Sequence, residues 1–328
     1  MRRLLSYIGI FSGLGLLVVS TSRPLMKNIG DWRYAHYGPM GVHHTPDGGD
    51  LVTMAYLDDE PKFCEPFGYT FVRRDTGAVD LYVFGDSYVM YLPDTAFANV
   101  HRYTFGRRDY TDINYTLNPH RRNILIIENA ERFIRMIGAQ RGIYQHVRKA
   151  GADIELFNSA INQNLEFNLF SYNFITPVRK LKADLTYRCW ARASGDAHVS
   201  EDGEYLFLAS TLSPRGPQSS YEPVPAAELS LIETGMDSVY RHYRQEGFDE
   251  VYFSIIPNPA SILQPKGYNG LIPALQAHGL PCIDVYGAFK ASSHAGELYR
   301  RGDTHWNDNG MHVWLNLVNS VLQACPPK

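Results

Sequence analysis

The sequence has few of the residues that mark metal-bound or disulfide-rich proteins. Its 328 residues include only four cysteines, which lie far apart at Cys64, Cys189, Cys282 and Cys325. Neither a Cys-x-x-Cys pair nor a mixed Cys/His cluster occurs, so we expect no metal site and no cofactor. In an exported chain up to two disulfides can form, and spacing alone does not choose among the three pairings. Cys282 lies in an apolar run and is expected to be a buried thiol.

An excess of charge of one sign is also lacking. The 31 Lys and Arg residues nearly balance the 34 Asp and Glu residues, and the formal net charge is −3. Because no basic cluster with interleaved aromatics occurs, we expect no nucleic-acid partner. Internal repeats are absent, and a hydrophobic content of 45% with 20% charged residues is ordinary for a globular protein. The 22 tyrosines either line a carbohydrate groove or, more commonly, pack in the core and rim.

The first 22 residues resemble an export signal. Arg2 and Arg3 precede an apolar run over residues 4–19, and this order is typical of a signal peptide or an N-terminal membrane anchor. A retained segment would keep its N-terminus in the cytoplasm and place the remainder on the periplasmic face of the inner membrane. A cleaved segment would release a periplasmic or secreted protein. We therefore expect an exported chain.

Alternating apolar strands and helices predict the fold. Buried strands are expected at residues 79–85, 100–105, 123–127, 250–256 and 281–286, with helices at 88–99, 133–137 and 311–323. This alternation predicts an α/β sandwich of three layers, with a parallel central sheet and helices on both faces. The catalytic domain is expected to span residues 79–325.

Two segments depart from this alternation. Residues 23–78 are rich in Gly, Pro and Asp and are interpreted as a spacer and lead-in, with one short strand at 51–57. Residues 151–228 are interpreted as an insertion that carries a β-hairpin, with its turn at Asp202 and Gly203. This insertion is either a lid over the site or a plain structural excursion, and the sequence favours neither.

The candidate catalytic residue is Ser87, which follows the first predicted strand in the sequence Gly85-Asp86-Ser87. Gly85 permits a sharp turn, so we expect the Ser87 hydroxyl at the strand end, near the N-terminus of the next helix. A serine becomes a nucleophile when an imidazole takes its proton and a carboxylate orients that imidazole. Asp303 and His305 supply these groups, and they point to the same side if the chain there is extended. In a parallel sheet, the polar residues that follow the strands gather at one edge; here they are Ser87, Asn129, Glu131, Asn258 and His305.

These motifs resemble those of a known superfamily. The run from Val83 to Ser87 is similar to the first block of the SGNH (GDSL-type) hydrolases, and the text Gly302-Asp303-Thr304-His305-Trp306-Asn307 is similar to the Asp-x-His block of their alginate O-acetyltransferase-like branch. The resemblance covers about residues 81–322 and implies an SGNH-type three-layer sandwich. It also implies Ser87 as nucleophile, His305 as base and Asp303 as the partner of that base.

The resemblance also suggests the remaining site residues. The text Glu128-Asn129-Ala130-Glu131-Arg132 stands in place of the usual Gly-x-Asn-Asp block and resembles a Glu-Arg pair of the acetyltransferase-like branch. Asn129 or Arg132 would complete the oxyanion hole with the Ser87 N–H. The alternative is that the Glu-Arg pair forms only a structural ion pair in the first turn of a helix. The other candidates for oxyanion or substrate positioning are Glu131, Asn258 and Trp306.

The expected function is transfer of an acyl group, acetyl above all, through Ser87 to hydroxyls of an exported polysaccharide. By the resemblance, a multi-spanning membrane acyltransferase would supply the acyl donor. One rival is a carbohydrate esterase or deacetylase with the same triad, in which water replaces the sugar hydroxyl. Another is a non-catalytic protein that binds or assembles the polysaccharide.

Overall fold

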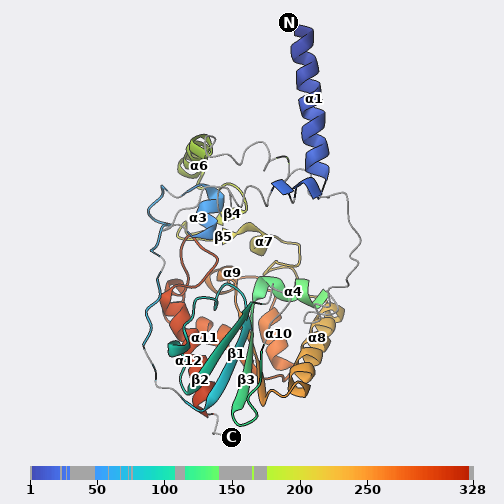
Figure 1. Cartoon of the computed structure of the whole chain (residues 1–328). Helices are drawn as coiled ribbons and strands as arrows, with labels where there is room; N and C mark the ends of the chain where they lie inside the picture. The colour runs from blue at the N-terminus through green and yellow to red at the C-terminus, as the bar shows by residue number, and fades with distance from the viewer. Residues whose placement is uncertain are drawn as a thin grey trace.

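The computed structural model describes residues 2–22, 24–26, 28–29, 49–57, 59–66, 68–72, 74, 77–107, 115–139, 165 and 176–324. Residues 158–173, the Asn-rich part of the predicted insertion, lie outside the described residues except for residue 165. Most of the described chain forms one α/β unit around a parallel sheet (Figure 1).

The central sheet has five parallel strands in the order β2-β1-β3-β6-β7. The strands are β1 (Val79–Gly85), β2 (Val100–Arg107), β3 (Arg122–Ala130), β6 (Glu250–Ile256) and β7 (Cys282–Ile283). Every residue of β1 is buried, and β3 is buried from its second residue onward. Strands that are covered on both faces require such continuous apolar runs, so the predicted α/β fold with a parallel sheet is confirmed.

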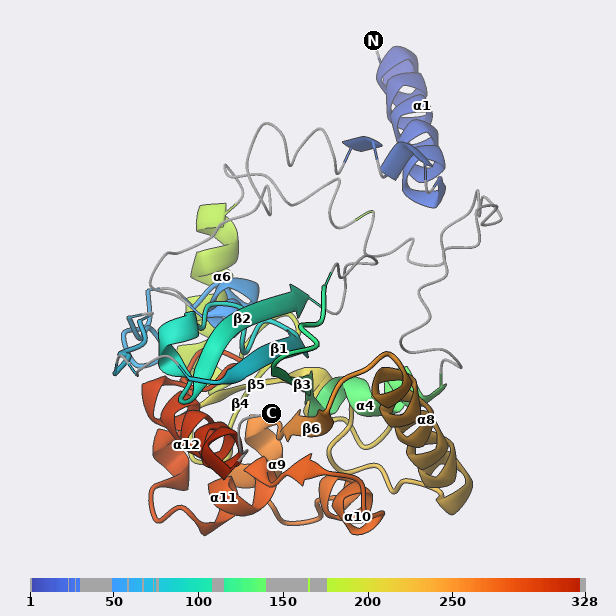
Figure 2. The same cartoon turned by 60° about the horizontal axis from the view of Figure 1, so that its bottom comes forward.

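Helices cover both faces of this sheet. Phe84 in β1 is in register with Ile127, and Ile127 with Phe253, so these side chains share one face. On that face α8 (Ala226–Gln245) packs its Tyr243 ring against Phe84, with ring centroids 5.6 Å apart. Ser254 points to the opposite face, where its hydroxyl accepts a hydrogen bond from Trp314 of α12 (Asp308–Ala324). Figures 1 and 2 show α8 and α12 on opposite sides of the sheet.

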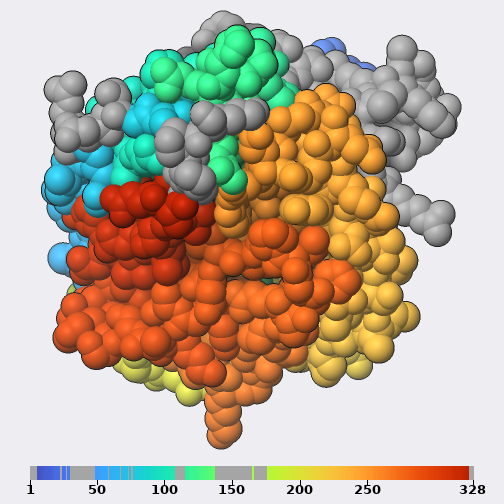
Figure 3. All heavy atoms as spheres, turned by 90° about the horizontal axis from the view of Figure 1, so that it is seen from below, coloured from blue at the N-terminus to red at the C-terminus, as the bar shows by residue number. Residues whose placement is uncertain are grey.

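The remaining elements of the main unit connect these layers. They are η1 (Asp94–Ala96), α4 (Glu131–Ala139), α9 (Pro259–Leu263), α10 (Leu271–Ala277), α11 (Val285–Ala291) and η2 (Ala295–Glu297). Figure 3 shows the end of the molecule opposite the carboxyl edge of the sheet, where residues of the C-terminal third form much of the surface. The carboxyl edge lies at the other end, where α4 begins (Figure 1).

A small second unit lies over the carboxyl edge of the sheet (Figure 1). It contains α3 (Asp50–Ala55), α6 (Thr176–Trp190), α7 (Ala209–Leu212) and the antiparallel pair β4 (Ala197–Val199) and β5 (Leu206–Leu208). The predicted hairpin is confirmed, and Gly203 in its turn has a φ of +73° that favours glycine. A separate apolar cluster of Leu51, Val52, Phe63, Val199 and Leu206 holds this unit together. Residues on either side of β1 in the sequence thus meet above the sheet.

Two predictions of local structure are wrong. Residues 88–99 form turns and the short η1 instead of one helix, because Pro93 interrupts the run and begins η1. Residues 51–57 hold the helix α3 and its end instead of a strand. Leu51 and Ala55, four residues apart, both face the second apolar cluster, and this spacing suits a helix.

The last predicted strand is shorter than expected. It covers only β7, because the Asp284 carboxylate accepts a hydrogen bond from Gly287 N at 2.7 Å and begins α11 there. Cys282 in β7 is half-buried, and burial raises the pKa of its thiol to about 11. Cys189 and Cys282 are free thiols, and Cys325 lies outside the described residues.

The N-terminal segment forms α1 (Arg2–Thr21), a helix of 20 residues. Several of its large apolar side chains are exposed, among them Phe11. Within the described part of the chain, no helix combines the length and the apolar character needed to cross a membrane.

Candidate active site

Ser87 stands on a turn that is tied to the neighbouring strand. The Asp86 amide donates to Glu128 Oε2 at 2.8 Å, and the Asp86 carboxylate accepts from Tyr88 N at 3.0 Å and Ala130 N at 3.2 Å. A Cβ on Gly85 would lie 2.6 Å from Glu128 Oε2, so only glycine fits where the turn begins. The turn therefore holds Ser87 in a fixed, half-buried position at the carboxyl edge of the sheet. No helix begins there.

The structure brings Ser87, His305 and Asp303 together. Ser87 Oγ lies 2.7 Å from His305 Nε2, and His305 Nδ1 lies 2.6 Å from Asp303 Oδ1. The chain between Asp303 and His305 is a tight loop instead of the expected extended segment. His305 N donates to Asp303 Oδ1 at 3.0 Å, a side-chain turn that places the ring beside its carboxylate.

Charge at the site favours a protonated imidazole and an ionised carboxylate. Burial by itself would raise the pKa of Asp303, but the hydrogen bond to His305 and the charges of His305 and Arg300 hold that pKa well below its usual range. The Arg300 guanidinium pairs with Asp303 Oδ2 at 2.5 Å. Burial by itself would lower the pKa of His305, and Asp303 more than offsets this, so the pKa is raised above its ordinary value. His305 can thus accept the Ser87 proton and keep the resulting charge.

Arg132 and Asn129 lie at the end of β3. The Arg132 side chain is buried, and its guanidinium lies 5.7 Å from the centre of the Tyr88 ring and 4.9 Å from that of Phe133. Its positive charge acts to lower the pKa of His305, so it lies within electrostatic reach of the imidazole. Asn129 is also buried, and its Oδ1 has no hydrogen-bond partner among the described residues.

Glu131, Asn258 and Trp306 are buried beneath this edge of the sheet. Glu131 Oε2 accepts from Asn258 N at 2.8 Å and from Ser261 Oγ at 2.6 Å, which joins the start of α4 to the end of β6. Trp306 is fully buried, and its ring centroid lies 5.0 Å from that of Tyr88. These contacts give all three residues a supporting place behind the edge where Ser87 stands.

Two residues near the triad were not predicted from the sequence. Thr304 lies between Asp303 and His305, and its carbonyl accepts a hydrogen bond from the Tyr88 hydroxyl. Asp50, the first residue of α3, accepts two hydrogen bonds from Thr304. Asp50 lies in the segment that was interpreted as a spacer, where no motif or periodicity distinguished it from other loop acids.

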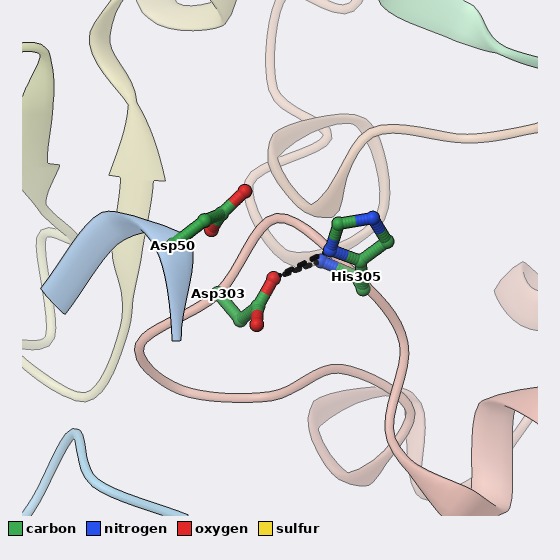
Figure 4. Close-up of side chains that lie close together, drawn as sticks. All are labelled: Asp50, Asp303 and His305. Atoms are coloured by element: carbon green, nitrogen blue, oxygen red, sulfur yellow. Dashed lines mark hydrogen bonds and ion pairs between the residues drawn. The ribbon is translucent and has the colours of Figure 1, made fainter. Parts of the chain in front are cut away.

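Asp50, Asp303 and His305 also form the one group of His, Cys, Asp and Glu side chains within the described ranges that could surround a cation. Their potential ligand atoms lie within 4.8 Å of one another (Figure 4). Both ring nitrogens of His305 already face hydrogen-bond partners, and Arg300 places a positive charge against Asp303. A cation there would have to displace these contacts, so the arrangement suits proton transfer better.

Comparison with known proteins adds no relative: no family model, no curated protein and no solved structure matches this chain.

Proposed function

We propose that this chain is an SGNH-type serine O-acyltransferase that carries an acyl group, acetyl above all, on Ser87 and passes it to a hydroxyl of an exported polysaccharide. One observation carries the proposal. The hydrogen-bonded line Ser87 Oγ, His305 Nε2, His305 Nδ1 and Asp303 Oδ1 has separations of 2.7 and 2.6 Å, the arrangement that activates a serine.

The reaction takes two steps. His305 Nε2 removes the Ser87 proton while Ser87 Oγ attacks the acyl carbonyl, and the resulting tetrahedral oxyanion collapses to an ester on Ser87. His305 gives its proton to the departing group. The acceptor hydroxyl then binds, His305 takes its proton, and the acceptor oxygen attacks the ester carbonyl. Collapse of this second intermediate breaks the bond to Ser87 Oγ, which recovers its proton from His305.

Positive charge at the carboxyl edge would stabilise the oxyanion. We propose three hydrogen-bond donors to the oxyanion: the Ser87 N–H, Asn129 and Arg132. The buried Arg132 is the strongest because its charge acts where water is scarce.

The acyl donor and the acyl acceptor complete the proposal. A multi-spanning membrane acyltransferase would supply the acyl group, and an exported chain, held by its N-terminal segment or released in the periplasm, would meet the polysaccharide there.

The test is intact-mass spectrometry of the chain mixed with an activated acetyl ester. We expect one acetyl adduct that maps to Ser87, is lost in Ser87→Ala and persists in Ser293→Ala, which alters an exposed serine. Acetylated and bare oligosaccharides are then added in turn. Faster transfer of the adduct to an oligosaccharide than to water supports the transferase.

The other outcomes identify the rivals. Loss of the adduct to water alone, or removal of acetyl groups from a decorated oligosaccharide, would show an esterase or deacetylase with the same triad. A chain that binds the oligosaccharide but forms no adduct, in the wild type as in Ser87→Ala, would show a non-catalytic binding or assembly protein.

A further inference from the structure

The helix α3 lies directly on the loop that carries Asp303 and His305. A Cβ on Gly49 would lie 2.2 Å from the Gly302 oxygen and 2.6 Å from Asp303 Cβ, so the two segments meet backbone to backbone. Val52 N donates to Gly302 O at 3.1 Å. Through this contact, a segment far from the triad in sequence becomes part of the wall of the site.

Asp50 accepts two hydrogen bonds from Thr304, the residue between Asp303 and His305 of the triad. Its Oδ1 accepts from Thr304 N at 2.8 Å, and its Oδ2 accepts from Thr304 Oγ1 at 2.5 Å. On the other side of the backbone, the Thr304 carbonyl accepts from Tyr88. Thr304 is thus held from both sides, and its two neighbours in the chain are Asp303 and His305.

We propose that Asp50 is a positioning residue of the catalytic base, whose carboxyl group fixes Thr304 and so the angle at which Asp303 and His305 face Ser87. The inference rests on the proposed function, since it assigns Asp50 to the same triad. Asp50 need not touch the substrate. It acts through Thr304 and through its place beside Asp303 (Figure 4).

The charges around Asp50 affect its protonation state. The ligand atoms of Asp303 and His305 lie within 4.8 Å of its carboxylate, and Arg132 on α4 lies within electrostatic reach. Arg300 pairs with Asp303. Burial and the negative charge of Asp303 raise the pKa of Asp50, while Asp303 stays ionised beside Arg300. Two carboxyl groups this close do not both ionise readily, so Asp50 takes up a proton more easily than an isolated aspartate does.

Substitutions at Asp50 and Thr304 remove different parts of this contact. Asp50→Asn keeps an oxygen that can accept from Thr304 N but puts an amide N–H where Oδ2 accepts from the Thr304 hydroxyl. Asp50→Ala removes both acceptors. Thr304→Val removes only the hydroxyl that reaches Asp50 Oδ2 and keeps the backbone contact.

The experiment measures kcat and KM for hydrolysis of 4-nitrophenyl acetate, and the low-field NMR signal of the His305 Nδ1 proton, in the full chain. We expect Asp50→Ala to lower kcat by about 10- to 100-fold with little change in KM, because the His305 ring is then held less firmly in the orientation that faces Ser87. Its Nδ1 proton signal should weaken or shift. Asp50→Asn and Thr304→Val each keep the contact to Thr304 N and lose the one to its hydroxyl, so in both kcat and the proton signal should lie between those of Asp50→Ala and the wild type.

The controls separate this proposal from the proposed function. His305→Gln assigns the proton signal by removing it, and Glu246→Gln is an exposed acid-to-amide change just before β6 begins, at the amino edge of the sheet. The NMR comparison needs no substrate, so it tests Asp50 even if no ester is hydrolysed. A normal kcat and an unchanged signal in Asp50→Ala would overturn the proposal, and so would an Asp50→Asn variant as impaired as Asp50→Ala. If Asp50→Ala does not fold, a Thr304→Val variant identical to the wild type overturns it.

Discussion

Ser87 Oγ and His305 Nε2 lie 2.7 Å apart although 218 positions separate them in the chain. The parallel sheet brings them together, because β1 delivers Ser87 to its carboxyl edge and the loop before α12 passes over the same edge. Tyr88, next to Ser87, holds the His305 loop in place. Its ring centroid lies 4.7 Å from that of the imidazole, and its hydroxyl donates a hydrogen bond to the Thr304 carbonyl. The core of the protein therefore fixes how the nucleophile and the base approach each other.

Asp303→Asn should reduce acyl transfer while leaving the fold intact. The amide cannot stabilise the imidazolium, so we expect kcat to fall by about 10³- to 10⁴-fold. Asp303 raises the pKa of His305, and its loss should lower that pKa. The base works only when neutral, so the rising limb of the pH–rate profile should move to lower pH. Stopped-flow kinetics across pH 5 to 9 would measure both changes, with exposed His294→Gln as control. A profile that stays in place would contradict the pairing of Asp303 with His305.

Arg132 should have the opposite effect on the same profile. Its charge acts to lower the pKa of His305, so Arg132→Gln should move the rising limb to higher pH. Loss of an oxyanion donor should also reduce kcat by about 100-fold. Arg132→Lys keeps the charge but not the planar group over Tyr88, so its limb should stay near that of the wild type while kcat falls. If both variants shift the limb equally, packing and not charge links Arg132 to the base.

The sequence was a good guide to the main sheet because strand burial leaves a direct mark on composition. The run over residues 250–256 is mostly apolar and has buried residues on both faces, and it coincides with β6. Ser87 and the pair Asp303 and His305 were predicted for a related reason: the sheet geometry requires the polar residues after its strands to share one edge.

Asp50 could not be predicted in this way. Its role depends on α3 lying against the Gly302 loop, a contact between segments about 250 residues apart that no periodicity records. The apolar run at residues 51–57 is too short to distinguish a strand from a helix, and only its packing against β4 and β5 decides the outcome. The turn after Ser87 was missed because hydrogen bonds of the Asp86 side chain and Pro93 override the helical tendency of residues 88–99.

Gly85→Ala should destabilise the protein through the turn that carries Ser87. The new Cβ would lie 2.6 Å from both Glu128 Oε2 and Val89 Cγ2, in a tightly packed region where neither atom can move freely. We expect the free energy of unfolding to fall by about 1–3 kcal/mol. Gly68→Ala is the matched control, since a Cβ there meets nothing within 4 Å. Urea denaturation of both variants would test this, and equal midpoints would show that Gly85 is not sterically required.

Glu131→Gln should change how stability depends on pH. Burial raises the pKa of Glu131 in the folded protein above its ordinary value of 4.5. The folded state then binds a proton that the unfolded state has released, so the wild type loses stability as the pH rises from 4.5 through the raised pKa. Glutamine keeps an acceptor for Asn258 N and the Ser261 hydroxyl and cannot ionise. We therefore expect the thermal midpoints of wild type and variant to be closest near pH 4 and to separate in favour of Glu131→Gln as the pH rises from 4.5 towards neutral. Exposed Glu246→Gln should show no such separation. A constant difference between wild type and Glu131→Gln at every pH would mean that folding leaves the pKa of Glu131 unchanged.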